Sequence, residues 1–138
     1  MNKISNFVYT GRVLTTGGRE GAARSDDGRL DVALTTPGAA GPGTNPEQLL
    51  AAGWSGCFLS AIQIAAREAK VAVPDDLAVN AEIDLGSNDS GYLLGARLNV
   101  SLPGIDPTIA RKLVDRAHET CPYSKATRNN INVEINLI

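Results

Sequence analysis

The feature that most constrains this fold is an uncharged stretch over residues 49–66 that follows a strong helix start signal. Asn45 can accept hydrogen bonds from the unpaired amides of a first turn, Pro46 suits the first helical position, and Gln48 can close a capping box. Apolar residues then lie almost all the way round the helix. The sequence therefore predicts a helix that begins at Asn45 and Pro46 and is buried on most of its faces.

The same stretch is long enough to be weighed as a membrane span. Small and polar residues interrupt it, and charged residues and alternating strand patterns flank it on both sides. The central helix of a soluble domain explains these facts better than a span does. Residues 1–7 lack the apolar run and cleavage site of a secretory signal, so we expect a cytoplasmic protein.

Length and charge narrow the class of protein further. A chain of 138 residues fits one domain, residues 1–138, with a core of useful size. The net charge is -2 and the basic residues are scattered, so the sequence carries no electrostatic footprint for nucleic acid or for an anionic membrane. We expect neither as a partner.

Alternating apolar residues predict strands on both sides of the central helix. They cover residues 3–14, 20–25 and 30–35 before it, and residues 77–85, 94–102 and 131–137 after it. A second helix is expected to begin at Asp106 and Pro107 and to end at Cys121 and Pro122. The resulting order, β-β-β-α-β-β-α-β, predicts an α+β domain.

The two cysteines differ in a way that suggests chemistry. Disulfides that only add stability are uncommon in the cytoplasm. Cys121 lies at the C-terminal end of its predicted helix, where the helix dipole disfavours a thiolate, whereas Cys57 could be ionised by a cation such as Arg19. Cys57 is therefore the better nucleophile and Cys121 the better second partner, although only tertiary folding could pair them.

Each candidate residue also has a structural interpretation. Cys57 can be a small buried hydrophobe, Arg19 a solvated loop residue, and Glu47 a charge that favours the helix dipole. A zinc site formed by Cys57, His118 and Cys121 would need a carboxylate or a second subunit to complete it. A hydrolase would need Cys57 beside His118, and the sequence gives no independent sign of that geometry.

Short motifs along nearly the whole chain are similar to those of one known family. With both cysteines in place, the set resembles the organic hydroperoxide resistance proteins of the OsmC-like superfamily. The resemblance implies an OsmC-like fold whose buried central helix carries the nucleophilic cysteine, in an intertwined homodimer with two active sites at the subunit interface. The motifs are Thr16-Gly17-Gly18-Arg19, Ser25-Asp26-Asp27-Gly28, Gly43-Thr44-Asn45-Pro46-Glu47-Gln48-Leu49, Ala51-Ala52-Gly53, Cys57-Phe58, Leu102-Pro103-Gly104, Ala117-His118, Cys121-Pro122-Tyr123-Ser124 and Ala126-Thr127-Arg128.

The resemblance further implies a thiol peroxidase that reduces alkyl and fatty-acid hydroperoxides to alcohols. By position, Cys57 corresponds to the peroxidatic cysteine and Cys121 to the resolving cysteine, which would form a disulfide with it. Arg19 matches the arginine that steadies the thiolate and the peroxide, and Glu47 the carboxylate that holds this arginine. The family binds no cofactor or metal for this reaction and draws its electrons from lipoyl groups on lipoylated proteins rather than from thioredoxin.

Trp54, Phe58 and Tyr123 could line an apolar pocket suited to an alkyl peroxide. Trp54-Ser55-Gly56 stands where the family often has a tyrosine and small residues, and Lys125 and Asn129 where asparagine and glycine are common. These departures leave the catalytic groups in place, so the resemblance predicts the reaction but not the shape of the pocket or the peroxide preference. Two alternatives remain: the sister branch of osmotically inducible proteins, which shares the fold and the cysteines, and a non-catalytic binding protein with inert buried cysteines.

One geometric problem follows from the resemblance. On a straight helix Glu47 and Cys57, ten residues apart, would be separated by about 15 Å, which Arg19 could hardly bridge. Either the helix breaks near Gly53, or Glu47 and Cys57 of one site come from different subunits. We expect the break at Gly53. We also expect the two glycines before Arg19 to let its loop swing out once the disulfide forms.

Overall fold

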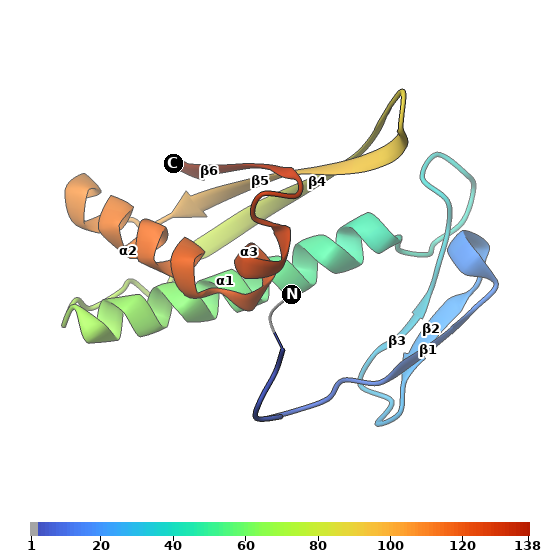
Figure 1. Cartoon of the computed structure of the whole chain (residues 1–138), viewed down its shortest axis with the longest axis horizontal. Helices are drawn as coiled ribbons and strands as arrows, with labels where there is room; N and C mark the ends of the chain where they lie inside the picture. Colours follow the sequence, from blue (N-terminus) through green and yellow to red (C-terminus); the bar gives the residue numbers. More distant parts are fainter. Residues whose placement is uncertain (1–2) are drawn as a thin grey trace. The chain divides into compact units, whose positions relative to one another are not determined.

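The computed structural model describes residues 3–138, which form two compact units, one up to Pro46 and the other over Glu47–Ile138. The first unit is a three-stranded antiparallel sheet in the order β1-β2-β3 (Figure 1). The turn at Gly28, whose N–H donates to the Ser25 carbonyl, joins β2 to β3 and confirms the predicted hairpin. The elements are β1 (Val13–Thr16), the 3₁₀ helix η1 (Gly18–Glu20), β2 (Ala22–Ser25) and β3 (Asp31–Ala33).

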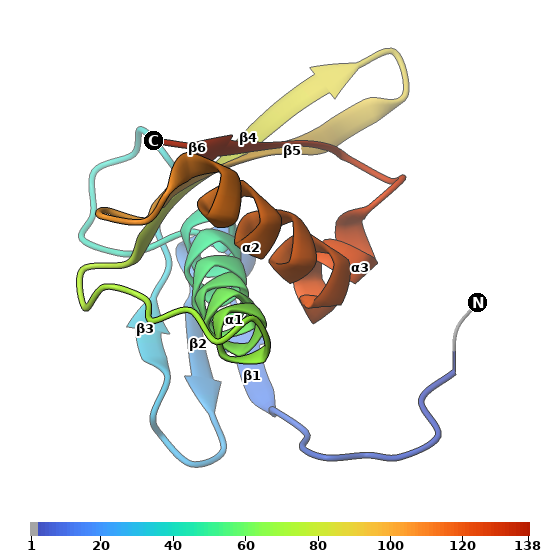
Figure 2. The same ribbon diagram turned by 90° about the vertical axis from the view of Figure 1, so that its left-hand side faces the viewer.

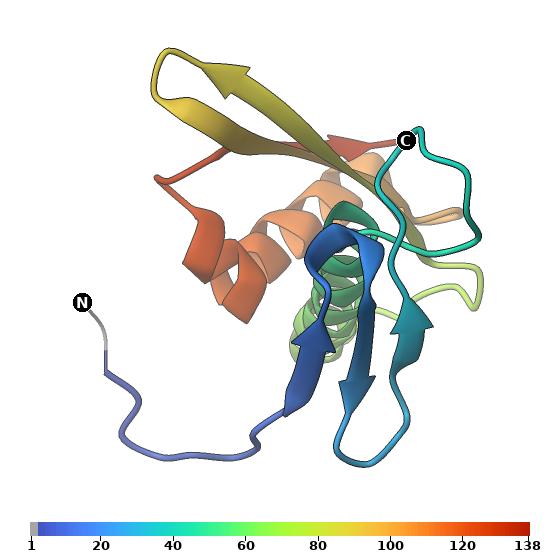
Figure 3. The ribbon, with the colours of Figure 1, turned by 90° about the vertical axis from the view of Figure 1, so that its right-hand side faces the viewer.

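The first strand was expected over residues 3–14, and that prediction is wrong for most of its length. The strand begins at Val13, and residues 3–12 lie outside any strand (Figure 3). Phe7, Val8 and Tyr9 suit a strand by composition, but their side chains are exposed by 74%, 92% and 81%. Apolar, β-prone residues form a strand only where a neighbouring strand supplies hydrogen bonds, and within the described chain these residues have none.

The second unit packs helices against one face of a second three-stranded sheet (Figure 2). Its strand order is β4-β5-β6, with β4 antiparallel to β5 and β5 parallel to β6. The parallel pairing requires a crossover, which α2 and α3 provide. The elements are α1 (Pro46–Glu68), β4 (Ala78–Asn88), β5 (Gly91–Ser101), α2 (Pro107–Thr120), α3 (Pro122–Thr127) and β6 (Asn132–Leu137). The predicted α+β class, the second hairpin, the second helix and the last strand are confirmed.

The short helix α3 was not predicted. Cys121 has an extended backbone (φ -59°, ψ 124°), which ends α2, and Pro122 then opens a new helix at its first position. The cysteine-proline pair was interpreted only as a helix end. The observed order is therefore β-β-β-α-β-β-α-α-β.

The core lies between the inner face of this sheet and the helices α1 and α2. Period-two alternation places Val79, Ala81 and Ile83 on that face, and the strand register sets them beside Val100, Leu98 and Ala96 respectively. On α2 the N-cap is Asp106, whose carboxylate accepts from the N–H groups of Thr108 and Ile109. The largest fully buried side chains of the core are Trp54, Phe58, Ile62, Leu98, Val100, Val114 and Cys121.

Helix α1 is buried on one face rather than on most of them, which corrects the expectation from its composition. Trp54, Phe58 and Ile62 are fully buried, whereas Ile64 is 51% exposed. The reason is that one sheet and one neighbouring helix can cover only part of a cylinder. By length and composition α1 is also the one helix of residues 3–138 that could cross a membrane, a test that the core helix of a soluble protein also passes.

We predict that Ile62→Ala lowers the free energy of unfolding by about 2–5 kcal/mol, because it leaves a cavity between α1 and the sheet. Ile64→Ala, a matched change two residues away on the exposed face, should cost less than about 0.5 kcal/mol. Urea denaturation followed by circular dichroism measures both. An equally large loss at Ile64 would mean that a surface outside this chain covers that face.

Candidate functional site

The two cysteines lie in direct contact although they are far apart in the sequence. The Sγ atoms of Cys57 and Cys121 are 3.3 Å apart, and both residues are free thiols. A disulfide bond is about 2.0 Å long, so the two thiols are in their reduced form and need only a small approach to bond. Cys121 is fully buried, whereas Cys57 is partly exposed. The pair is therefore reachable from solvent through Cys57.

Three helices position this pair. Cys57 lies on α1, between the buried face and the exposed face. Cys121 is the junction of α2 and α3: its N–H donates to the Ala117 carbonyl at 2.8 Å, and its carbonyl accepts from the Lys125 N–H at 3.0 Å. The junction residue thus has its backbone held by both helices, which fixes the direction of its side chain toward α1.

The surroundings of Cys57 disfavour its thiolate. Burial raises the pKa of Cys57 above its ordinary value, and the hydrogen bond and charge of Cys121 raise it further. A hydrogen bond from the backbone N–H of Tyr123 acts in the opposite direction and lowers this pKa. The net shift is upward, so a nucleophilic Cys57 needs an additional positive charge.

Arg19 lies in η1 of the first unit, in a turn whose backbone requires glycine. Gly17 and Gly18 have φ angles of 72° and 57°, in the left-handed region. A Cβ at Gly21 would lie 1.7 Å from the Thr16 carbonyl oxygen, which no side chain can meet. These glycines therefore hold the tight turn that presents Arg19, and the expected swing of this turn stays a prediction.

Glu47 lies in the first turn of α1, ten residues before Cys57. The expected break at Gly53 is wrong, because α1 is continuous from Pro46 to Glu68. A glycine weakens a helix interior by only about 1 kcal/mol, which the packing of α1 overcomes. Glu47 and Cys57 of one chain are thus separated by about 15 Å along the helix axis.

The three expected pocket residues have different surroundings. Trp54 and Phe58 are fully buried in the core cluster that also contains Cys121. Tyr123 is 38% exposed, and its ring lies against α1 at Gly53. Two contacts at Tyr123 could not be predicted from the sequence: that of its backbone N–H with Cys57 and that of its ring with Gly53. A glycine four residues before a candidate nucleophile was the available signal, and it was interpreted as a break.

The surroundings of His118 bear on the two alternatives to a peroxidase, a Cys-His hydrolase and a zinc site. Burial, and then the charge of Arg128, lower the pKa of His118 below its ordinary value, so the ring is neutral at pH 7. Its Nδ1 atom is buried without a hydrogen-bond partner among the described residues, and the Cys57 thiol pairs with Cys121 instead. Within residues 3–138 no three His, Cys, Asp or Glu side chains are grouped to hold a metal ion.

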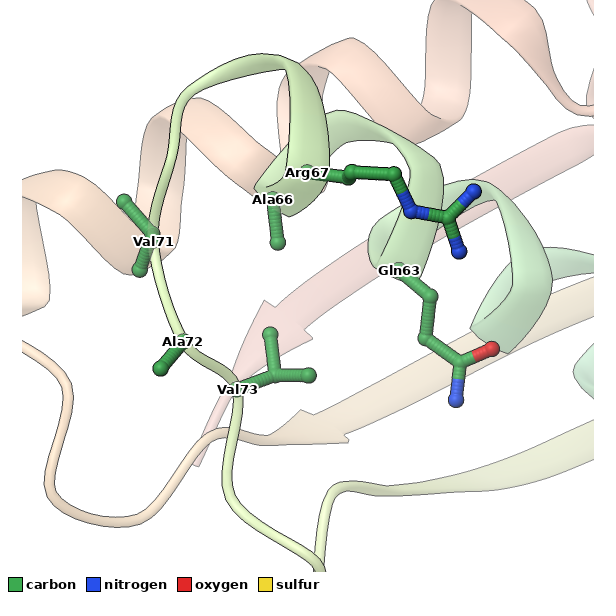
Figure 4. A pocket seen from close by; sticks show the side chains of 6 residues that line it. All are labelled: Gln63, Ala66, Arg67, Val71, Ala72 and Val73. Atoms are coloured by element: carbon green, nitrogen blue, oxygen red, sulfur yellow. The ribbon is translucent and has the colours of Figure 1, made fainter.

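A hollow of about 480 Å³ lies further along α1 and is separate from the cysteine pair. Figure 4 shows its lining, in which the Arg67 and Gln63 side chains extend beside the loop that follows α1. Neither cysteine contributes to it. Its lining residues are Gln63, Ala66, Arg67, Val71, Ala72 and Val73.

Sequence comparisons agree with the motifs. Residues 38–136 match the model of the OsmC-like protein family. The chain is 42% identical to an organic hydroperoxide resistance protein of Xanthomonas axonopodis pv. citri, over 99% of each chain. It is 39% identical to the organic hydroperoxide resistance protein OhrB of Bacillus subtilis, over 94% of this chain and 98% of the relative.

Comparison with solved structures gives the same result. The crystal structure of Bacillus subtilis OhrB matches with a TM-score of 0.91 and 40% identity, over 96% of this chain and all of that chain. An organic hydroperoxide resistance protein of Vibrio cholerae, solved with captopril bound in one of its active sites, matches with a TM-score of 0.91 and 38% identity. That match covers 99% of this chain and 96% of the other.

Proposed function

The chain belongs to the organic hydroperoxide resistance proteins of the OsmC-like family, and from this premise we propose that it is a cysteine-based peroxidase that reduces organic hydroperoxides to alcohols. The observation that carries the proposal is the contact between the Cys57 and Cys121 sulfur atoms at 3.3 Å. Two inert core cysteines have no need to meet, whereas a nucleophile and its resolving partner must.

In the proposed reaction the Cys57 thiolate attacks the terminal peroxide oxygen. The O–O bond breaks, the alkoxide takes a proton and leaves as an alcohol, and Cys57 becomes a sulfenic acid. The Cys121 sulfur then attacks the Cys57 sulfur, a water molecule leaves, and a disulfide forms. The burial of Cys121 supports its role as the resolving cysteine, because burial keeps this thiol away from the peroxide and beside Cys57.

Activation of Cys57 is assigned to Arg19. A guanidinium beside the sulfur would offset the burial that raises the pKa of Cys57, and Glu47 would hold this guanidinium through paired hydrogen bonds. Because α1 is unbroken, we propose that Glu47 and Cys57 of one site come from different subunits of a homodimer. The exposed apolar side chains of the N-terminal segment, such as Phe7 and Val8, support a second copy.

The proposed electron donor is a lipoyl dithiol on a partner protein, with no cofactor bound to the chain itself. Its two thiols would reduce the Cys57–Cys121 disulfide by exchange. The proposed place of the reaction is the cytoplasm, without nucleic acid or membrane as a partner. Thioredoxin in place of dihydrolipoamide should support slower turnover in the same assay.

We predict that the protein consumes cumene hydroperoxide faster than hydrogen peroxide when dihydrolipoamide is the reductant. Cys57→Ser should reduce consumption to the background rate, and Cys121→Ser should leave a sulfenic acid on Cys57. One equivalent of peroxide should remove two hydrogens from the wild-type mass, with Cys57 and Cys121 in one disulfide-linked peptide.

Each contrary outcome of this assay has a separate meaning. Equal rates with both peroxides would favour the osmotically inducible branch. Consumption that survives Cys57→Ser, with no disulfide, would favour a binding protein with inert cysteines. Stoichiometric zinc in the purified protein would favour the metal site.

We predict that Arg19→Ala raises the pKa of Cys57, because only the Tyr123 N–H then opposes the effects of burial and Cys121. Below its pKa the alkylation rate of a thiol follows its thiolate fraction, so alkylation at pH 7 should slow and the pH profile should move to higher pH. Iodoacetamide labelling of Cys57 between pH 5 and 10 measures this. Arg29→Ala, an exposed arginine of the same unit, is the matched control, and an equal shift there would contradict the role of Arg19.

Subunit mixing tests whether one site uses two chains. Cys57→Ser and Glu47→Ala subunits should each give a poorly active homodimer. A heterodimer purified through two affinity tags should regain about half of the wild-type activity, because one of its two sites then carries neither change. No recovery would mean that Glu47 and Cys57 act within one chain.

A further inference from the structure

The Tyr123 side chain occupies space that exists only because residue 53 is glycine. A Cβ built on Gly53 would lie 2.7 Å from the Tyr123 hydroxyl oxygen, 3.3 Å from Cζ and 3.8 Å from Cε1. The first of these distances is shorter than van der Waals contact allows, so a side chain at residue 53 must displace the ring. Gly56, the other glycine of α1, has no atom within 4 Å of its Cβ position among the described residues.

Tyr123 therefore spans the space beside the nucleophile. Its backbone N–H contacts Cys57, and its hydroxyl end contacts Gly53. Gly53 and Cys57 are four residues apart on a continuous helix, so they lie one turn apart on one face. Tyr123 is 38% exposed, which places it at the border between the thiol and solvent.

We propose that Gly53 is a specificity-determining residue, which keeps the approach to Cys57 wide by letting the hydroxyl end of Tyr123 lie against α1 one turn before the thiol. The proposal rests on the peroxidase function proposed above and adds a size filter to it. A side chain at residue 53 and a displaced ring together narrow this approach. Large substrates then lose more than small ones, because steric exclusion grows with the size of the group that must pass.

The glycine has no other evident structural role. It does not break α1, and its backbone is helical, so no left-handed angle requires it. Alanine is the better helix former at such a position, and replacement should therefore not weaken the helix itself. The contact with Tyr123 is what the absence of a side chain provides.

The test compares Gly53→Ala with wild type, using cumene hydroperoxide as the large substrate and hydrogen peroxide as the small one. The ratio of the two kcat/KM values should fall about tenfold in Gly53→Ala, the effect of about one methyl group in a tight apolar site. In a Tyr123→Phe background, Gly53→Ala should lower this ratio much less than it does in the wild type. The Tyr123 hydroxyl oxygen, the atom at 2.7 Å, is then absent. Gly56→Ala, the matched control, should leave the ratio unchanged, since a general loss of activity cancels in it.

A second readout separates this proposal from the proposed function. Alkylation of Cys57 by N-phenylmaleimide, a large reagent, and by iodoacetamide, a small one, needs no peroxidase activity. The ratio of the N-phenylmaleimide rate to the iodoacetamide rate should fall in Gly53→Ala, recover in the double variant and stay unchanged in Gly56→Ala. An unchanged ratio in Gly53→Ala, or no recovery in the double variant, would overturn the role of Gly53. If the alkylation ratio changes as expected but the wild type consumes no peroxide, the peroxidase function is overturned and the size filter at Gly53 stands.

Discussion

The structure of the second unit depends on the burial of one face of α1 against the β4-β5-β6 sheet. Trp54, Phe58 and Ile62 fill the space under strands whose inner face consists of alternating apolar residues. Helix α2 closes the same core through Val114. Because Cys57 lies at the edge of the buried face, the packing that stabilises the unit also fixes the position of the sulfur.

The same burial opposes the chemistry proposed for Cys57. Removal from water raises the pKa of a thiol, and the neighbouring Cys121 adds to that effect. A site that only packed these sulfurs together would hold Cys57 as a neutral thiol. The proposed activation therefore relies on a charge from outside this core, the role proposed for Arg19 in its glycine-held turn.

The parts of the fold that could be predicted from the sequence are those whose local pattern and tertiary surroundings agree. The hairpin of β4 and β5 alternates over its whole length, and α2 begins at Asp106 with both a cap and a proline. Residues 3–12 have strand-forming side chains but no partner strand among residues 3–138, and periodicity cannot report a missing partner. The six residues of α3 make less than two turns, too few for a hydrophobic period.

The site shows a different limit of sequence reasoning. That Cys57 and Cys121 are the reactive residues could be proposed from the motifs, but their 3.3 Å contact depends on the junction of α2 and α3, of which α3 was not predicted. Gly53 illustrates the same point. A glycine in a sequence marks a place where a side chain is absent, either for backbone freedom or for the close approach of another group. Only the Tyr123 ring shows which of the two applies.

Two independent features of α1 support the proposed second copy. The helix carries no charge from residue 49 to residue 66, yet within residues 3–138 only one of its faces is buried. Its unbroken course also keeps Glu47 about 15 Å from Cys57. In a two-fold symmetric pair of antiparallel α1 helices that meet midway between these residues, Glu47 of each subunit would lie level with Cys57 of the other. The pairing that covers the apolar face would then also complete the site, so the continuity of α1 through Gly53 favours a site shared by two subunits.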